Sequence, residues 1–456
     1  MYSDALNPFE KKTALSLSLV FSLRMLGLFM IMPVFAIYGQ DLTGYSPMWV
    51  GIAIGAYGLT QALLQIPAGM LSDKIGRRPV IYGGLLIFAI GSLIAGFSES
   101  VYGVTLGRAL QGCGAIASAI LALAADNTRE QQRSKAMGMI GVSIGLAFTV
   151  SMVVGPILAP FIGLHGLFFI TAAGAIFGIF IIYFLVPNTA NIKAPKGETI
   201  AIPSLIASLI KKPELLRLNL GIFILHLSLT AIFITLPIQL LQMKLPANEH
   251  WQVYLPALLI SFILIVPMLI ISAKKQKNKH FYLFSIGLMA LSLLTMAFSH
   301  HSLSVMFFAI LLFFTAFNFL EASLPAFISM LSPAGTKGTA MGIYSTCQFS
   351  GAFMGGVIGG ISYRLFGHSG LFLCLTVLMI VWFLLSLKMQ NPSKIKTFTF
   401  SNPTITQQKA VQLKRQLSAL SGTLEVAITL NEQTVYIKAN TQIFQPQQAK
   451  LILEDS

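Results

Sequence analysis

The residues of this chain that can do chemistry are few, and the most informative ones lie within long apolar stretches. Glu321 is the one acid placed well within such a stretch in the second half of the chain, and His226 lies in another. A desolvated carboxyl group can have its pKa raised towards neutrality, which suits a proton carrier. A structural hydrogen bond between helices explains Glu321 equally well, and packing is the better explanation of His226. Proton coupling at these two residues is therefore a hypothesis with a structural alternative.

Two arginines are also enclosed by apolar residues. Arg24 lies ten residues into the first stretch, so we expect it to face a cavity, where it could hold an anionic substrate group or tune a nearby acid. Arg108 and Gln111 lie near one end of the fourth stretch. A charge at this depth faces a cavity or a partner, or its side chain extends to the interface with water. Asp41 ends the first stretch, where it either belongs to the same path or is only solvated.

A third group of charges lies in the short segment between the second and third stretches, Gly69-Met-Leu-Ser-Asp-Lys-Ile-Gly-Arg-Arg-Pro79. Its two glycines permit a tight turn and close helix contact. Its aspartate can meet the positive end of a helix, and its first arginine can pair with a carboxylate across the bundle. The sequence therefore predicts a conformational latch, although basic residues at a turn are the simpler explanation. The expected members are Gly69, Asp73, Gly76, Arg77, Arg78, Asp126 and Arg133.

The composition requires that these residues be positioned by helices in a lipid bilayer. The chain is 55% hydrophobic and only 10% charged, with a mean hydropathy of +0.78. About 20 apolar residues span a bilayer, and twelve stretches satisfy this requirement. They are 14–38, 49–70, 80–98, 102–125, 136–160, 166–186, 218–242, 252–272, 281–298, 302–328, 339–363 and 369–387. The first is too long for a cleavable signal and is followed by no cleavage pattern.

The basic residues set the direction of the spans. With the N-terminus in the cytoplasm, 18 Lys and Arg fall in cytoplasmic segments and two, Lys244 and Arg364, fall outside. This asymmetry predicts a multi-pass membrane protein with both termini cytoplasmic. Because the net charge of +15 comes from short clusters between apolar runs, it indicates contact with anionic lipid and not with nucleic acid.

The two halves of the chain resemble each other at an offset of 204 residues. Phe29–Val34 aligns with Phe233–Ile238, and Lys135–Ile140 aligns with Thr339–Tyr344. Two such halves commonly enclose a cavity at mid-depth and rock about it. The predicted domains are an N-terminal six-helix half, an inter-half linker with an amphipathic helix, a C-terminal six-helix half, and a linker followed by a cytoplasmic domain. Their ranges are 1–187, 188–217, 218–388 and 389–456.

The last segment has the periodicity of a small α+β domain. A strand at Thr397–Phe400, a helix with apolar positions up to Leu420, a hairpin of Leu424–Leu430 and Val435–Ala439, and a helix from Pro446 follow in order. The order predicts a ferredoxin-like fold. It resembles heavy-metal-associated domains, but the chain lacks their C-x-x-C loop, so no metal is expected. The three cysteines are too dispersed for a disulfide framework, and neither an enzyme motif nor a cofactor motif is present.

These motifs resemble those of the major facilitator superfamily. The segment Gly69–Pro79 is similar to its signature between spans two and three, and Arg108-Ala-Leu-Gln-Gly-Cys-Gly is similar to its second motif, whose arginine is associated with proton coupling. Gly155 and Pro156 match the span-five pattern of its drug–proton antiporters, although Ser151, Ala159 and Pro160 replace expected glycines. Together with the appended domain, the chain resembles the YajR-type group of bacterial inner membranes.

The resemblance implies an all-α membrane protein with twelve transmembrane helices in two six-helix halves and a small ferredoxin-like domain. It further implies a monomeric, proton-coupled secondary transporter that exports a small solute. The 34 Phe residues fit lipid contact and packing, and they also fit a cavity wall for a lipophilic solute. No cofactor is expected. Import of a solute with protons, or a sensor with vestigial transport, are the alternatives.

Overall fold

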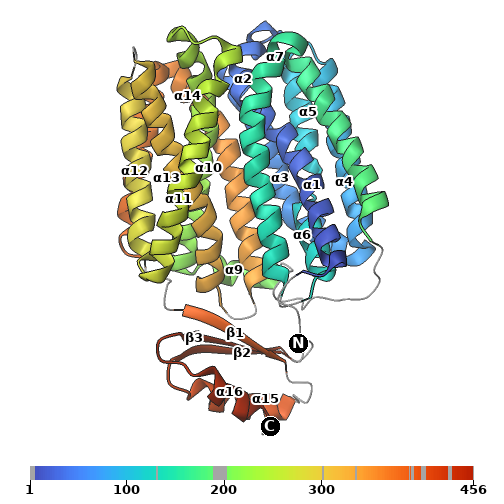
Figure 1. Cartoon of the computed structure of the whole chain (residues 1–456), viewed down its shortest axis with the longest axis vertical. Coiled ribbons are helices and arrows are strands. Elements are labelled where there is room, and N and C mark those ends of the chain that lie inside the picture. Colours follow the sequence, from blue (N-terminus) through green and yellow to red (C-terminus); the bar gives the residue numbers. More distant parts are fainter. Residues whose placement is uncertain are drawn as a thin grey trace.

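A computed structural model describes residues 6–129, 132–187, 203–299, 302–333, 336–389, 391, 395–401, 407–429 and 434–454. These residues form a long helical bundle with a small α+β domain at one end (Figure 1). The helices of the first half are α1 (Pro8–Met30), α2 (Met32–Tyr38), α3 (Pro47–Ile75), α4 (Arg77–Phe97), α5 (Val101–Cys113), α6 (Ala117–Asp126) and α7 (Arg133–Leu185). Those of the second half are α9 (Pro203–Ile210), α10 (Pro213–Gln242), α11 (Trp251–Lys274), α12 (Asn278–Phe298), α13 (Leu303–Leu331) and α14 (Lys337–Ser386). Two short 3₁₀ turns, η1 (Gly39–Asp41) and η3 (Ala247–Glu249), complete the bundle.

Two of these helices are hairpins of two spans each. A straight helix of the 53 residues of α7 would be about 80 Å long, far more than the roughly 30 Å of a bilayer core. Its Gly163 has φ 64° and ψ −175°, and Gly367 of α14 has φ 67° and ψ −164°. These left-handed values favour glycine, and they turn the chain back. The ten apolar helical stretches of the described residues thus make twelve passes, which confirms the predicted number.

The repeat is visible in the same positions. Gly163 and Gly367 are 204 residues apart, as the sequence alignment requires. Near the other end of the bundle, Thr128 Oγ1 donates to the Ala124 carbonyl at 2.7 Å. The residues 204 further on repeat that bond, because Ser332 Oγ donates to the Ile328 carbonyl at 2.5 Å. The two halves therefore share both their turns and their helix ends.

The predicted fourth span, 102–125, is interrupted. It consists of α5 and α6, with no helix at Gly114–Ile116. A Cβ on Gly112 would overlap the Tyr57 carbonyl of α3, and a Cβ on Gly114 would overlap the Gly84 carbonyl of α4. The end of α5 thus packs directly against the backbones of α3 and α4, and its helical hydrogen bonding stops at this point. The Q-G-x-G pattern is thus a packing requirement.

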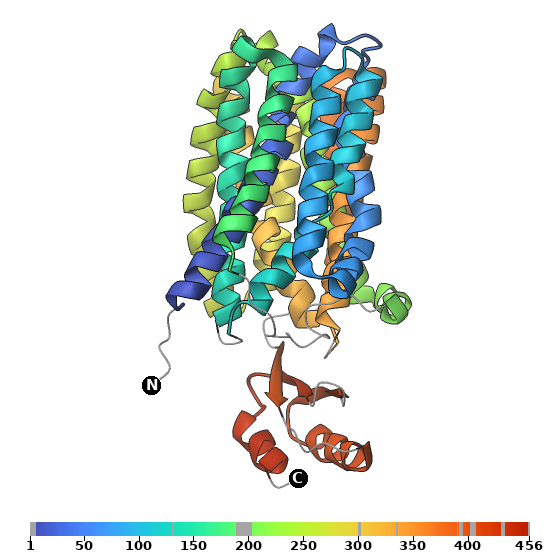
Figure 2. The ribbon, with the colours of Figure 1, turned by 90° about the vertical axis from the view of Figure 1, so that its right-hand side faces the viewer.

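The two halves meet mainly through α3 and α14. A Cβ on Gly51 would overlap the Gly356 carbonyl, and a Cβ on Gly356 would overlap the Gly51 carbonyl. Gly55 and Gly58 approach the backbone of α14 in the same way. These contacts lie in the part of α3 that is remote from the α+β domain, at what we call the far end of the bundle. The other end, which carries the start of α1 and the α+β domain, is the basic end (Figure 2).

The α+β domain follows the predicted order. Its elements are β1 (Ile395–Ser401), α15 (Gln407–Ser418), β2 (Thr423–Thr429), β3 (Thr434–Asn440) and α16 (Pro446–Glu454). The strands form an antiparallel sheet in the order β1-β3-β2. Val435, Ile437 and Ala439 of β3 pack on the two helices, and the opposite side of β3 is buried too. Figure 1 shows why: the sheet lies between its helices and the bundle.

One predicted element can be followed only in part. In the inter-half linker 188–217, residues 188–202 lie outside the described residues. The described part of this linker contains the helix α9 (Pro203–Ile210). The hairpin tip at 431–433 also lies outside them.

Candidate functional site

The second half of the bundle holds one polar cluster in contact across three helices. His226 of α10 places Nε2 3.0 Å from Oε2 of Glu321 on α13. Gln348 of α14 donates from Nε2 to Glu321 Oε1 at 3.0 Å and lies 2.8 Å from His226 Nε2. At 3.0 Å the imidazole and the carboxyl group are within hydrogen-bond distance, and either group can be the donor. The fold thus brings together two expected residues, and it adds Gln348.

The depth and exposure of Glu321 suit proton exchange. It lies ten residues before Leu331, the end of α13, which is about 15 Å from the basic end at 1.5 Å per residue. Its side chain is 37% exposed, whereas that of His226 is 13% exposed and lies against the Phe317 ring at 5.8 Å. An accessible carboxyl group at mid-depth can take up and release a proton. Nothing in the spacing of the sequence distinguishes Gln348, because a lone glutamine on an apolar helix has no signature.

The expected site in the first half differs from this cluster, because Arg24 is enclosed. Its side chain is 1% exposed. Nη2 donates to Gln61 Oε1 at 2.6 Å, and Gln61 donates to Gln65 Oε1 at 2.6 Å. The guanidinium carbon lies 5.7 Å from the ring centroid of Tyr57 and 5.6 Å from that of Phe88. The expectation that Arg24 faces an open cavity is not met, because two rings and an amide hold the cation among α1, α3 and α4.

Arg108 is enclosed as well. It is 1% exposed, and it donates from Nη1 to Gln111 Oε1 at 2.9 Å. Nε and Nη2 donate to the carbonyls of Ala53 and Ile54 at 3.4 and 3.3 Å. Its guanidinium carbon lies 5.4 Å from the Tyr57 ring centroid. The side chain therefore does not extend to the interface with water but ties α5 to α3.

Three of the residues expected to form a latch, Asp73, Arg77 and Asp126, lie in contact at the basic end of the first half. Arg77 Nε lies 3.1 Å from Asp126 Oδ2, as predicted, and Nη1 donates to Ser72 Oγ at 2.8 Å. Asp73 pairs with Arg77 one turn away. The sequence predicted the positive end of a neighbouring helix as the partner of Asp73. The arginine takes that place because Gly76, at φ 100°, turns it back towards α3.

Gly69, Arg78 and Arg133, which were also expected in the latch, contact helix ends and neighbouring helices. A Cβ on Gly69 would lie 3.1 Å from a side chain of α6, so this glycine permits close helix packing. Arg78 donates to the Val186 carbonyl at the end of α7. Arg133 donates from Nε to the Ala125 carbonyl at 3.2 Å, so it caps α6. These contacts fix the loops on either side of the Arg77 cluster.

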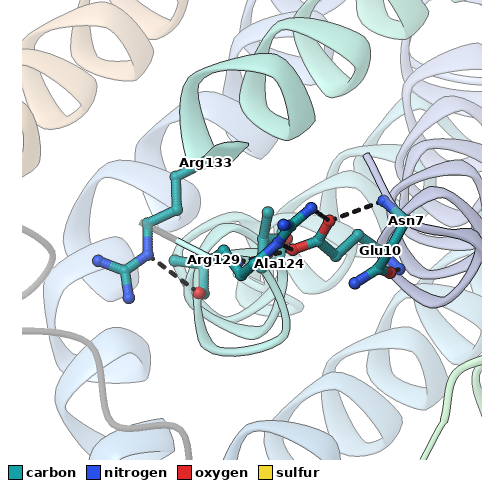
Figure 3. Close-up of polar contacts among 7 residues, drawn as sticks. Asn7, Glu10, Ala124, Arg129 and Arg133 are labelled. Atoms are coloured by element: carbon teal, nitrogen blue, oxygen red, sulfur yellow. Dashed lines mark hydrogen bonds and ion pairs between the residues drawn. The ribbon is translucent and has the colours of Figure 1, made fainter. Parts of the chain in front are cut away.

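A further ion pair at this end has no counterpart in the sequence analysis. Glu10 is 2% exposed and accepts from the Arg129 backbone at 3.0 Å, from Nε at 2.8 Å and from Nη2 at 2.9 Å (Figure 3). Asn7 and Glu10 also form a reciprocal capping box at the start of α1. The N-x-x-E pattern at the edge of an apolar run was the available signal for the cap, but no local pattern indicates Arg129.

Asp41 lies apart from these groups, at the far end. It lines a cavity of about 290 Å³ together with Glu99 and His165. The fold does not bring Asp41 together with Glu321, which lies at mid-depth in the other half.

Gly155 has a packing explanation. A Cβ on Gly155 would overlap the Met30 carbonyl, so α7 meets the end of α1 backbone to backbone. Pro156 follows within the helix. Both positions adjoin the break between α1 and α2.

In the part of the chain that the structure describes, no three His, Cys, Asp or Glu side chains lie close enough together to bind a metal ion. Cys113, Cys347 and Cys374 are free thiols. The first lies on α5, and the other two lie on the two spans of α14.

Comparison with known proteins agrees with this architecture. The family model of the Major Facilitator Superfamily matches residues 17–278 and 257–431. The chain is 44% identical over 439 residues to the inner membrane transport protein YajR of Escherichia coli, covering 96% of each chain. It is 38% identical over 392 residues to an uncharacterized transporter of Buchnera aphidicola from Schizaphis graminum, covering 85% of this chain and 99% of the relative. A solved bacterial homologue of the human lysosomal transporter Spinster, in an inward-facing and occupied conformation, shares the fold with a TM-score of 0.69 at 14% identity, covering 84% and 97% of the two chains.

Proposed function

Because this chain belongs to the major facilitator superfamily and is a multi-pass secondary transporter of the inner membrane, we propose that it exports a small, lipophilic solute in exchange for protons. The observation that carries the proposal is the contact of Glu321 with His226 and Gln348 at mid-depth. In this proposal both termini and the basic end are cytoplasmic, as the distribution of Lys and Arg predicts.

The chemistry of the step follows from the carboxyl group. A charged carboxylate within a bilayer is costly unless it is paired or hydrated. Protonation of Glu321 removes that cost and allows α13 to be enclosed. Loss of the proton restores the charge and favours the conformation in which water reaches the side chain. Proton binding therefore shifts the equilibrium between two conformations by its different free energy in each.

The conformation of the bundle is consistent with access from the basic end. The backbone contacts between α3 and α14 close the far end, while Glu321 is 37% exposed. In the proposed cycle the far end opens when the basic end closes, and the Arg77 cluster holds the loops of the first half while this occurs. The direction of export rests on Gly155 and Pro156, the positions that match the antiporter pattern.

The test is substrate-induced proton movement in proteoliposomes that contain the full-length protein. A panel of lipophilic cations and small metabolites is added against an imposed pH gradient. Export by exchange predicts that one compound moves protons in the direction opposite to its own. Movement in the same direction would establish import with protons. Silence across the panel, with folded protein, would favour the sensor.

The decisive variant is Glu321→Gln, which keeps the shape and hydrogen bonding of the side chain and removes its charge. Positioned proton transfer contributes at least about 100-fold to rates, so coupled flux should fall by about that factor. Glu214→Gln is the matched control, because Glu214 pairs with Arg217 near the basic end, where it takes no part in the cluster. Equal flux in both variants would remove Glu321 from the mechanism.

A further inference from the structure

Among the buried hydrogen-bond donors of the first half that have no acceptor in the described residues, three lie around one aromatic ring, that of Tyr57. They are Nε and Nη1 of Arg24 and the hydroxyl of Tyr57. Both residues are almost fully enclosed, at 1% and 2% exposure. A buried donor that makes no hydrogen bond loses the free energy of its hydration without compensation. Such groups are rare in folded proteins, and each one calls for an explanation.

The same place carries two positive charges, and no carboxylate among the described residues pairs with either of them. Arg108 lies on the Tyr57 ring at 5.4 Å, and Arg24 lies on the same ring at 5.7 Å. Both arginines bond to amides or carbonyls in the described structure. By contrast, the buried carboxylate of Glu10 is paired with Arg129. The aromatic rings attract a guanidinium group by their faces, but they supply no acceptor in the plane of its N–H bonds.

We propose that Arg24 and Tyr57 form a binding site for a small monovalent anion, either a halide or the carboxylate of a solute. One anion would accept hydrogen bonds from both residues and would compensate the charges of Arg24 and Arg108. Charge-assisted bonds of this kind are about twice as strong as neutral ones. The inference does not depend on proton coupling at Glu321.

The position of the site gives it a route to the space between the halves. Tyr57 also contacts the Phe349 ring of α14 at 6.3 Å, across the boundary between the halves. Arg24 of α1 donates to Gln61 of α3, which donates to Gln65 one turn further along α3, in the direction of the basic end. When the halves part, the Tyr57–Phe349 contact opens, and an anion can reach Arg24 along these amides.

The experiment measures anion-dependent stability of the purified full-length protein. Ligands that bind the folded state raise its unfolding temperature with a saturable dependence on concentration. Sodium chloride, bromide and formate are compared with gluconate, which is too bulky for the site, at constant ionic strength. We expect saturable stabilisation by the small anions and none by gluconate. A response to halides without formate assigns the site to a halide. A response to formate that longer carboxylates share assigns it to a solute.

Two conservative variants make the test specific. Tyr57→Phe keeps the ring and removes one donor, and the affinity for the anion should fall roughly tenfold, the loss expected for one hydrogen bond to a charged group. Tyr254→Phe is the control, because the Tyr254 hydroxyl is also buried without an acceptor but packs against Phe233 and not against an arginine. Arg24→Gln should abolish the response to small anions. If the Arg24→Gln protein does not fold, the affinity of Tyr57→Phe is the test of the site. A wild-type protein without a saturable response, or an equal response in the two tyrosine variants, would overturn the proposal.

Discussion

The two halves of the bundle secure the same helix end by different means. In the first half, the loop after α6 is held by Arg129, which binds the buried Glu10 of α1. The position 204 residues after Arg129 is Pro333, which cannot make such a pair. There, Lys438 of the α+β domain donates to the carbonyls of Leu331 and Ser332 at 2.8 and 3.0 Å. The appended domain thus supplies the cation that the second half lacks.

The repeat-related acids show the same difference. Glu214 stands 204 residues after Glu10. It pairs with Arg217, within its own helix, at 2.8 Å and is partly exposed. Glu10 instead reaches a loop 119 residues away. The two halves thus share a fold without sharing the ion pairs and hydrogen bonds at the basic end. In the second half these bonds come from a domain outside the repeat.

The largest effect is expected from Glu10→Gln. The change removes the carboxylate that accepts three hydrogen bonds from Arg129, whose side chain is itself 33% exposed, and we expect about 2 kcal/mol of lost stability. Glu214→Gln is the matched change in the second half, where a partly exposed pair contributes at most about 1 kcal/mol. Thermal unfolding of the purified proteins measures both. Similar losses in the two variants would contradict the comparison.

The next effect concerns His226 and Gln348, the partners of Glu321. His226→Ala should lower coupled flux about tenfold, because the carboxyl group loses a hydrogen-bonded neighbour that can accept or donate a proton. Gln348→Ala should cost only about threefold, since an amide orients the carboxyl group without exchanging protons. Flux in proteoliposomes is the measurement. A larger loss in Gln348→Ala than in His226→Ala would show that orientation matters more than proton sharing.

A third prediction tests the appended tie. Lys438 is 8% exposed, and its burial lowers the pKa of its ammonium group. When the domain is docked, the hydrogen bonds of Lys438 to the end of α13 should outweigh the free-energy cost of burying its charge by about 1 kcal/mol. Lys438→Ala should therefore increase limited proteolysis of the segment between the bundle and β1 about fivefold. Lys414→Ala, on the exposed side of α15, should leave it unchanged. Equal cleavage in both variants would show that other contacts hold the domain.

The smallest effect is the coupling within the latch. Arg77 and Asp126 are 17% and 25% exposed. A double-mutant cycle of Arg77→Gln and Asp126→Asn should give a coupling free energy of about 0.5–1 kcal/mol, as for other partly exposed pairs. A coupling near zero would leave the contacts with Ser72 and Asp73 as those that hold Arg77.

Much of the fold followed from sequence patterns that are local. Hydropathy gave twelve spans, and the offset of 204 anticipated the matched turns at Gly163 and Gly367. Alternation and turn residues gave the order of the α+β domain. The pairing of Arg77 with Asp126 was predictable because both residues stand at the ends of neighbouring spans.

The failures share a physical cause, which is that they depend on how helices rotate against one another. Hydropathy fixes the depth of Arg24 but not the direction of its side chain, so the expected open cavity proved to be an enclosed site. Gln348 and Arg129 acquire their partners only through packing across the bundle. The break at Gly114 arises from neighbouring backbones that no local pattern reveals.

The glycine contact of α3 with α14 has a consequence for the kinetics of the transport cycle. Two backbones that touch directly have no long side chains to immobilise, so closing the far end costs little rotamer entropy. Dispersion attraction also loses up to about half of its strength over the first 1 Å of separation. In the proposed cycle we therefore expect the far end to be either closed or open, because a partly separated surface has already lost much of its contact energy.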